Sequence, residues 1–368
     1  MNPRYRIVHS EAATSFGGQE NRIFKEMIAM RERGHELEAI CQPHAQLTER
    51  LRAEGFTVHT LLMDGTVNYW KGVVRLRQLF KKRRFDVLNT HSRRDTLLVG
   101  LAGRLGGVPL IVRTRHLARK PNSLLSYTTI PHRVITVSQH VRQLLIDRGV
   151  APSDVETVYS PVPFPSGPLH STLRDELGLA ADNIVIGCVA VMRRPKGHRD
   201  LVDALEPILA SRSDIHAVFV GGGEEVFNEV KAYISQKGLA KQIHLTGRRN
   251  DVPNCLAAFD IFALATHFEA SGTVFVEAAA AGLPVIGTDV GGVSEMFQDG
   301  VTGILVPPKN PAAMTQALQT LINSPEKRLA MGKAAYNDFW DSGRFSTEAM
   351  VQKTEDCYTR WLAERKKR

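Results

Sequence analysis

Cysteine is scarce in this sequence, and the few residues present are scattered. Cys41, Cys188, Cys255 and Cys357 share no metal-ligand spacing, so the sequence predicts neither a cysteine-based zinc site nor a disulfide-stapled scaffold. We therefore expect reduced and mostly buried thiols, as in a cytosolic protein. Aromatic residues make up only 7% of the chain and are not interleaved with basic residues as in proteins that stack nucleic-acid bases.

Long hydrophobic runs are absent as well. No apolar segment approaches the roughly 20 residues that cross a bilayer. Residues 1–10 lead directly into a strand-like run and lack the apolar core of a signal peptide, so we expect a cytoplasmic protein. With 43% hydrophobic residues the chain is globular, and its 368 residues exceed one hydrophobic core, which predicts two domains.

The positive charge is concentrated in one half of the chain. Residues 1–165 hold 25 of the 47 Lys and Arg but 14 of the 38 Asp and Glu, a balance of +11, whereas the remainder has a balance of −2. This half is therefore expected to face something anionic. Its most basic segment, 69–84, has helical periodicity, with these residues on or near one face: Trp70, Val73, Val74, Arg77 and Phe80. Such a helix either packs on a sheet with a solvated rim or binds anionic lipid, to which 365–368 would contribute.

Strand-like and helical runs alternate throughout, which predicts a parallel, doubly wound sheet in each half. Predicted strands are 5–9, 36–41, 57–61, 86–90, 109–114 and 133–137, then 184–191, 215–221, 243–246, 260–265, 284–288 and 304–306. Predicted helices in the first half are 18–33, 69–84, 96–105 and 139–148. The segment 160–168 holds four prolines in nine residues and is expected to be a linker between domains 1–165 and 166–346.

The segment 267–307 carries the most informative pattern, which reads as a loop, a helix, a buried strand and a second glycine loop. Glu269 precedes the helix and Glu277 lies one turn within it. A loop that opens a helix at the carboxyl end of a strand binds anions, because unpaired N–H groups and the positive end of the helix dipole point outward. A carboxylate on each side of such a site predicts a ligand with hydroxyls at both ends, such as a nucleotide sugar.

The residues between the two glutamates fit this interpretation. Ala270, Ser271 and Gly272 form a small-residue hinge in which Gly272 allows the backbone to approach a phosphate. Thr273, Val274 and Phe275 would supply the N–H groups of the first turn.

This block resembles the retaining glycosyltransferases of family 4, whose signature is two glutamates separated by seven residues. The resemblance continues through 282–286, 291–295 and 300–303 in the family's order and spacing, and it covers nearly the whole chain. It implies an α/β protein of the GT-B fold, with two doubly wound Rossmann-like domains facing across a cleft. The last helix, about 347–368, would cross back onto the first domain.

In the second domain, the resemblance implies that Arg193 and Lys196 bind the donor diphosphate, since both cations stay charged at neutral pH. Arg194 competes with Arg193, because the chain has Ala190-Val191 where many members have Gly-Arg. The nucleobase would lie near Arg248.

The remaining implied roles fall to glutamates and to first-domain loops. Glu269 would bind sugar hydroxyls and Glu277 the ribose. Gly17 and Gly18 would approach the distal phosphate and shape the acceptor pocket, unless they form a plain turn. His116 would lie beside the transferred sugar, unless it is structural. His91 and Ser92 are weaker candidates for lining the same side of the cleft.

The implied reaction transfers a sugar from a nucleoside diphosphate to an acceptor hydroxyl with retained anomeric configuration, on one face of the sugar. The leaving phosphate would help to take the acceptor proton, with Glu269, His116, Arg193 and Lys196 as the catalytic residues. The sequence contains no Asp-x-Asp, so we expect no metal and no other cofactor. UDP is expected rather than GDP, although no residue identified here fixes the base, sugar or acceptor.

The resemblance further implies a glycan or lipid-linked acceptor in lipopolysaccharide or other surface-polysaccharide synthesis. We hypothesise a peripheral protein on the cytoplasmic face of a bacterial inner membrane, with the basic half toward anionic lipid. The alternatives are a nucleotide-sugar epimerase or phosphorylase of the same fold and a basic nucleic-acid-binding protein. The last of these explains the charge but not the glutamate block. The sequence does not predict the oligomeric state.

Overall fold

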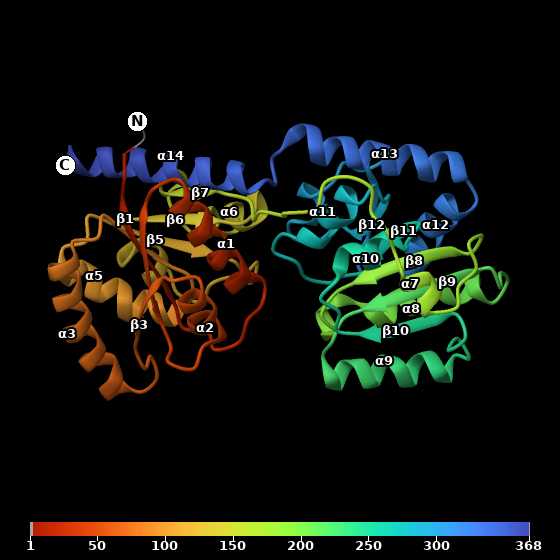
Figure 1. Ribbon diagram of the computed structural model, residues 1–368, viewed down its shortest axis with the longest axis horizontal. Coiled ribbons are helices and arrows are strands. Elements are labelled where there is room, and N and C mark those ends of the chain that lie inside the picture. The colour runs from red at the N-terminus through yellow and green to blue at the C-terminus, as the bar shows by residue number, and fades with distance from the viewer. Residues whose placement is uncertain (1–2, 368) are drawn as a thin grey trace. The chain divides into compact units, whose positions relative to one another are not determined.

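The computed structural model describes residues 3–367, which divide into two compact units (Figure 1). One unit contains the chain up to Pro161 together with the segment from Arg344 onward, and the other is Val162–Gly343. The first change of unit lies within the proline-rich segment 160–168. The second lies directly before the last helix.

The first unit is built on seven parallel strands in the order β3-β2-β1-β4-β5-β6-β7. Its central strands are buried along almost their whole length, because helices cover both faces of a doubly wound sheet. All six predicted strands are present, and β7 is an addition that is too short to show a periodicity. The bounds are β1 Arg6–Glu11, β2 Glu36–Cys41, β3 Thr57–Thr60, β4 Val87–Thr90, β5 Leu110–Arg115, β6 Arg133–Thr136 and β7 Val155–Thr157.

The helices of this unit follow the strands as predicted, with α2 as an addition. The segment predicted as one helix over 96–105 is a π-helix over Thr96–Gly100 followed by an α-helix over Leu101–Gly106, and a three-residue α-turn over Arg93–Asp95 precedes it. The α-helices are α1 Gly18–Glu32, α2 Gln46–Ala53, α3 Thr66–Arg83, α4 Arg93–Asp95, α5 Leu101–Gly106, α6 Gln139–Ile146 and α14 Thr347–Lys366.

The basic helix α3 has two apolar faces rather than one, which corrects the predicted face. Val73 and Phe80 are buried in the core. Trp70 and Val74, grouped with them by periodicity, are 58% and 59% exposed and continue a stripe that begins at Val67. The stripe and the core face are both apolar, so the sequence pattern alone did not separate them.

The last helix returns to the first unit, as the resemblance implied. Figure 1 shows α14, in blue, along the same unit as the red strand β1, and it packs against α1 and β5. Tyr358 and Trp361 are fully buried in the core that they share with α1. Arg33, which directly follows α1, donates hydrogen bonds of 2.6 Å to Glu348 and Glu355 of α14. The helix is therefore part of this unit's core.

The second unit contains six parallel strands in the order β10-β9-β8-β11-β12-β13, and all six predicted strands are present. The strands are β8 Ile184–Val189, β9 Ile215–Val220, β10 Ile243–Gly247, β11 Ile261–Leu264, β12 Val285–Thr288 and β13 Gly303–Val306. The helices are α7 Leu173–Glu176, α8 His198–Leu209, α9 Glu224–Gln236, α10 Val252–Ala257, α11 Thr273–Ala280, α12 Pro311–Ile322 and α13 Pro325–Ser342. The predicted fold class, two Rossmann-like α/β domains, is confirmed.

Two of the expected absences can be examined in the described residues. All four cysteines are free thiols and buried. Within residues 3–367, no helix combines the length and the apolar character that a membrane span requires.

Candidate active site

Lys196 and Glu269 form an ion pair, although 72 residues separate them in the sequence. Lys196 lies in the loop after β8 and Glu269 in the loop after β11. The two strands are neighbours in the sheet, so their carboxyl ends bring the two loops together. Both side chains are mostly shielded from solvent, with exposed fractions of 25% and 15%. The pair concentrates one cation and one carboxylate at the edge where ligands of open α/β sheets bind.

The backbones of these two loops are also joined. Pro195 O accepts a hydrogen bond of 2.7 Å from the His267 N–H and one of 3.1 Å from the Thr266 hydroxyl. Gly197 has a φ of +66°, and a Cβ atom there would lie 1.8 Å from the carbonyl oxygen of Ala265. Only glycine fits this contact. The close packing of Gly197 on Ala265 therefore fixes the position of the neighbouring Lys196.

A further pair, His267 with Asp200, also links the loop after β11 to the segment that follows β8. His267 Nε2 lies 2.7 Å from an oxygen of Asp200 at the start of α8. Sequence reasoning missed both residues, because a lone histidine beside Glu269 has no periodic signal and its partner lies 67 positions away.

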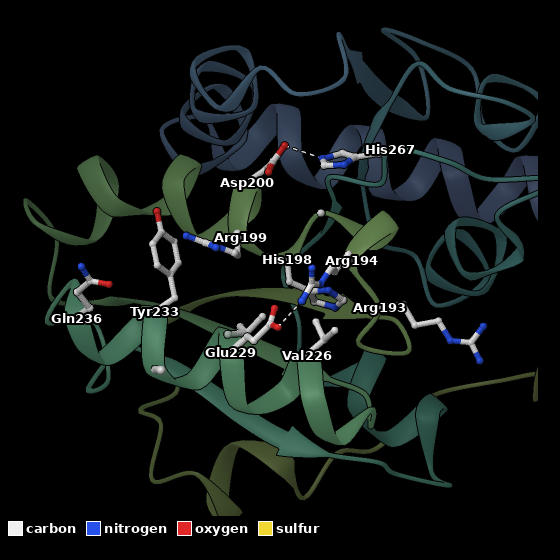
Figure 2. Close-up of a pocket in the computed structure, with 13 residues that line it drawn as sticks. Arg193, Arg194, His198, Arg199, Asp200, Val226, Glu229, Tyr233, Gln236 and His267 are labelled. Atoms are coloured by element: carbon white, nitrogen blue, oxygen red, sulfur yellow. Dashed lines mark hydrogen bonds and ion pairs between the residues drawn. The ribbon is translucent and has the colours of Figure 1, made fainter.

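The structure separates the two candidate arginines. Figure 2 shows Arg194 directed toward Glu229 of α9, whereas the side chain of Arg193 extends in a different direction. Arg194 is held at 2.7 Å by Glu229 and at 3.5 Å by Glu225. Arg193 makes no side-chain hydrogen bond or ion pair with residues 3–367, so its charge is available for an anionic ligand.

The cavity in Figure 2 is lined by Arg193 but by no other residue of the predicted donor site. It measures about 530 Å³ and lies between α8 and α9, lined by residues such as Arg199, Val226 and Tyr233. Neither Glu269 nor α11 contributes to its wall.

The amino end of α11 has the geometry of an anion site. Gly272 caps the helix in the left-handed region with a φ of +82°. The Phe275 N–H, one of three predicted donors, is used within the turn, since it donates to Gly272 O at 3.0 Å. Thr273 and Val274 remain as the first-turn donors, and Ser271 is buried beside them.

Between Phe275 and Ala280 of α11, Glu277 is half-buried and every other residue is buried. The neighbours Phe275, Val276, Ala278 and Ala279 are all buried. A glutamate in such a helix does not belong to a solvated face.

The second glycine loop, 289–292, packs against the backbone of Glu269. A Cβ atom on Gly291 would lie 1.8 Å from the carbonyl oxygen of Glu269, and the Gly292 N–H donates to the same oxygen at 3.3 Å. Gly291 also has a positive φ of +58°. This loop was predicted from the family's spacing alone, and the structure gives the spacing a physical reason.

The candidate base-reading loop lies at the same sheet edge. Gly247 O, directly before Arg248, accepts a hydrogen bond of 2.9 Å from the Gly221 N–H. A Cβ atom on Gly222 would lie 3.2 Å from Cβ of Arg248. The turn at 221–223 therefore packs against Arg248 and the loop after β8.

In the first unit, the diglycine loop opens α1 as predicted. The Gly17 N–H donates to Glu20 at 2.7 Å, and a Cβ atom on Gly18 would meet nothing within 4 Å. Space for a ligand group therefore remains beside Gly18.

Two acidic residues beside this loop were not identified from the sequence. Glu11 ends β1 and accepts hydrogen bonds from the Ala12 and Ala13 N–H groups at 2.7 and 2.8 Å. Burial, together with the nearby Asp95 carboxylate, raises the pKa of Glu11 to about 8. Asp95 accepts from Ser10 at 2.7 Å and from the His91 N–H at 2.8 Å, and its own pKa is raised by burial.

His116, predicted beside the transferred sugar, ends a row of three histidines. Its Nε2 lies 3.0 Å from Nδ1 of His91, and His91 Nε2 lies 3.0 Å from Nδ1 of His9. Burial is the main cause that lowers the pKa of all three, to about 3 for His9. His91 was a weaker candidate. His9 was missed, because a residue in the middle of a buried strand is expected to belong to the hydrophobic core. Ser92 donates to Asp95 at 2.7 Å through its hydroxyl and caps α4.

Comparison with known proteins places the chain in a family. Residues 170–338 match the profile of the glycosyl transferases group 1, and residues 16–164 match that of glycosyltransferase family 4. The chain belongs to the family 4 glycosyltransferases. The enzyme is thus a glycosyltransferase, which decides against the epimerase, phosphorylase and nucleic-acid-binding alternatives.

Several relatives of this glycosyltransferase resemble it over most of their length. An Escherichia coli UDP-Gal:alpha-D-GlcNAc-diphosphoundecaprenol alpha-1,3-galactosyltransferase is 25% identical over 328 residues, which cover 82% of this chain and 84% of the relative. A glycosyltransferase from Rickettsia africae has a TM-score of 0.88 at 23% identity, covering 98% of this chain and 99% of its own. The Anabaena protein HepE, in complex with UDP and glucose, has a TM-score of 0.84 at 21% identity, covering 97% and 100%. The two structures show the shared fold.

Proposed function

We propose that the enzyme transfers a sugar from a nucleoside-diphosphate sugar to a hydroxyl of a glycan or lipid-linked acceptor, with retention of anomeric configuration. The observation that carries this proposal is the Lys196–Glu269 pair beside the amino end of α11, with Glu277 one turn further. A diphosphate needs cations and N–H donors, and sugar hydroxyls need carboxylates. The site offers both at one edge of the sheet.

Each group has a distinct part in the proposed reaction. Lys196, Arg193 and the first-turn N–H groups of α11 stabilise charge on the leaving diphosphate. Glu269 accepts hydrogen bonds from sugar hydroxyls, and Glu277 from the ribose. As the bond from the anomeric carbon to the phosphate oxygen breaks, the acceptor oxygen bonds to that carbon on the same face. The acceptor proton passes to an oxygen of the leaving phosphate.

The finer assignments rest on similar proteins. One relative is named for a UDP-galactose donor and a diphosphoundecaprenol-linked acceptor, and one structural neighbour holds UDP. We therefore propose UDP rather than GDP as the nucleotide. We also propose a role in lipopolysaccharide or other surface-polysaccharide synthesis.

We propose that no divalent metal takes part, because the positive charge near the leaving group comes from Lys196, Arg193 and the helix terminus. The proposed acceptor also suggests a peripheral position at the cytoplasmic face of the inner membrane. The exposed apolar stripe of α3, which is Val67, Trp70 and Val74, is flanked by Lys71 and Arg75 and supports such contact with anionic lipid.

Thermal stabilisation by UDP, GDP, ADP, CMP and their common sugar conjugates tests the donor site. We expect a rise in Tm with UDP or a UDP-sugar, lost in Lys196→Ala and Glu277→Ala because each removes a ligand contact. Arg194→Ala is the matched control, since Glu229 holds that arginine on the other side of the loop. A wild-type protein that no nucleotide stabilises, with or without a glycolipid extract, would contradict the proposal. Turnover that stops in chelator and returns with Mn²⁺ or Mg²⁺ would contradict metal independence.

A further inference from the structure

A second cavity, outside the candidate active site, lies against the basic helix α3 in the first unit. It measures about 250 Å³ and lies between α3 and β3, which is the edge strand of the seven-stranded sheet. Its lining comes from the carboxyl end of β3, the residue that follows it and one side of α3: His59, Thr60, Leu61, Arg75, Leu76, Gln78, Leu79 and Lys82. The proposed sugar transfer uses none of these residues.

The cavity has an apolar floor and a polar rim. Leu76 is 2% exposed, and Leu61 and Leu79 are half-buried. The helix packs closely on this floor, since a Cβ atom on Gly72 would lie 3.1 Å from Cδ2 of Leu61. The other lining residues that α3 contributes are exposed: Arg75, Gln78 and Lys82. The cavity therefore offers apolar contact at its base and positive charge at its opening.

Arg75 and Lys82, the two cations at the opening, form no hydrogen bond or ion pair with residues 3–367. Other arginines of the same helix are engaged. Arg77 donates to a backbone carbonyl of α5 at 3.2 Å, and Arg83 pairs with Glu38. The opening of the cavity therefore holds two positive charges that an anionic ligand can neutralise.

The sequence of α3 places these cations beside its exposed apolar stripe. Residues 71, 75, 78 and 82 follow one another at steps of four, three and four, so they lie on one face of the helix. The stripe, which is Val67, Trp70 and Val74, has helical spacing of the same kind on the adjoining face. A helix that lies in the surface of a membrane has this arrangement, with apolar residues toward the acyl chains and cations toward the phosphates.

We propose that this cavity binds the headgroup of an anionic phospholipid, with Arg75 and Lys82 on its phosphate and the stripe of α3 in the adjoining acyl layer. Guanidinium and ammonium groups form charge-assisted hydrogen bonds to phosphate oxygens, and the Gln78 amide can bond to a headgroup hydroxyl. The inference rests on the proposed membrane position and adds a defined binding site to it. A general attraction to a charged surface acts on every exposed cation of α3, whereas a site acts through two of them.

Charge-matched variants distinguish a site from general attraction. Arg75→Gln with Lys82→Gln removes two charges at the cavity, and Lys81→Gln with Arg84→Asn removes two exposed charges at the same end of the helix that do not line it. Asparagine suits position 84 because Arg84 has a positive φ of 53°. In sedimentation with phosphatidylglycerol vesicles, we expect the cavity variant to bind at least about tenfold more weakly than the control variant. Equal losses in the two variants would overturn the site.

A short-chain lipid reports on the cavity in the absence of a membrane. The readout is the set of side-chain Nε–H signals of the ¹⁵N-arginine-labelled protein, titrated with dihexanoyl phosphatidylglycerol below its micelle concentration. We expect the Arg75 signal, assigned with Arg75→Gln, to shift and to saturate, while the Arg77 signal stays in place because a backbone carbonyl holds that group. An equal shift with inorganic phosphate would mean an adventitious ion only. An Arg75 signal that the lipid does not shift would also contradict the proposal.

The outcomes separate this inference from the proposed function. Melting curves establish that the cavity variant folds, and its rise in Tm with UDP should match that of the wild type, because no lining residue belongs to the candidate active site. Wild-type protein that ignores anionic vesicles would refute the membrane position and this site with it. Wild-type protein that no nucleotide stabilises would refute the proposed transfer, while the vesicle and NMR results still decide the role of the cavity.

Discussion

Glu11 is a buried carboxyl group at the carboxyl end of β1, with 1% of its surface exposed. Its pKa of about 8 in the folded protein lies above the ordinary value of 4.5 because of burial and the neighbouring Asp95. Between these two pH values the unfolded chain releases the proton and the folded chain keeps it. The free energy of unfolding therefore falls as pH rises through this window, and the loss is complete above about pH 8.

Glu11→Gln should remove this pH dependence, since glutamine cannot ionise but still accepts hydrogen bonds from the Ala12 and Ala13 N–H groups. We expect the variant to match the wild type near pH 5 and to be more stable at pH 8.5, by on the order of 2 kcal/mol. Urea unfolding at several pH values measures the difference. Glu36→Gln is the control, because Glu36 is an exposed partner of Arg6. Wild-type and Glu11→Gln curves that stay parallel across this range would show that Glu11 does not titrate as stated.

Residue identity predicted which residues are candidates for the site, but not which charges meet. Glu269, Glu277 and Lys196 were predicted from their loops and from family spacing. The choice of Arg193 over Arg194 depended on Glu229, which lies in a different helix. His9 and Glu11 gave no sequence signal, because each lies within or at the end of a buried strand.

At the scale of elements, the loop 289–292 acts as a support for Glu269. Alanine at Gly291 would place its Cβ 1.8 Å from the carbonyl oxygen of Glu269 and would also take an unfavourable positive φ. The loop would have to shift, and Glu269 with it.

Gly291→Ala should therefore lower kcat/KM by about 100-fold, since small displacements of positioning groups have effects of this size. Gly300→Ala is the matched control. Gly300 also has a positive φ, of +73°, but its Cβ would meet nothing within 4 Å. We expect that variant to lose about 1 kcal/mol of stability and to keep its activity. Steady-state kinetics and denaturation of both variants measure the contrast. Equal activities would show that Glu269 is not held by this contact.

Elements were predicted well because strand and helix periodicities are local properties. The exceptions are short or ambiguous. β7 has three residues and α2 has eight. The two apolar faces of α3 have the same periodicity, and only contact with the rest of the unit determined which one became core.

At the scale of the whole molecule, the charge asymmetry and the stripe Val67, Trp70 and Val74 lie in the same unit. Cations near an anionic surface contribute about 1 kcal/mol each, and an exposed tryptophan adds apolar contact. In the tail, Arg365 instead donates to Pro109 O at 2.5 Å, and Arg368 lies outside the described residues.

Binding to vesicles of anionic and of neutral phospholipid tests this surface. We expect the wild type to sediment with anionic vesicles at low salt and to be released by salt. The variant Trp70→Ser with Val74→Ser should bind at least about fivefold more weakly. Leu329→Ser is the control, because Leu329 is 71% exposed on α13 of the other unit. Wild-type protein that ignores anionic vesicles at low salt would refute the membrane hypothesis.

The sequence by itself determined the two α/β domains, the linker, the family and the glutamate block, because these depend on patterns within short segments. Tertiary structure decided what depends on strand order. The adjacency of β8 and β11 pairs Lys196 with Glu269, and that of β1, β4 and β5 aligns three histidines. Strand order is a property of the whole sheet, since each neighbour is set by crossovers and packing far along the chain. Residues distant in sequence thus become one site only when the sheet forms.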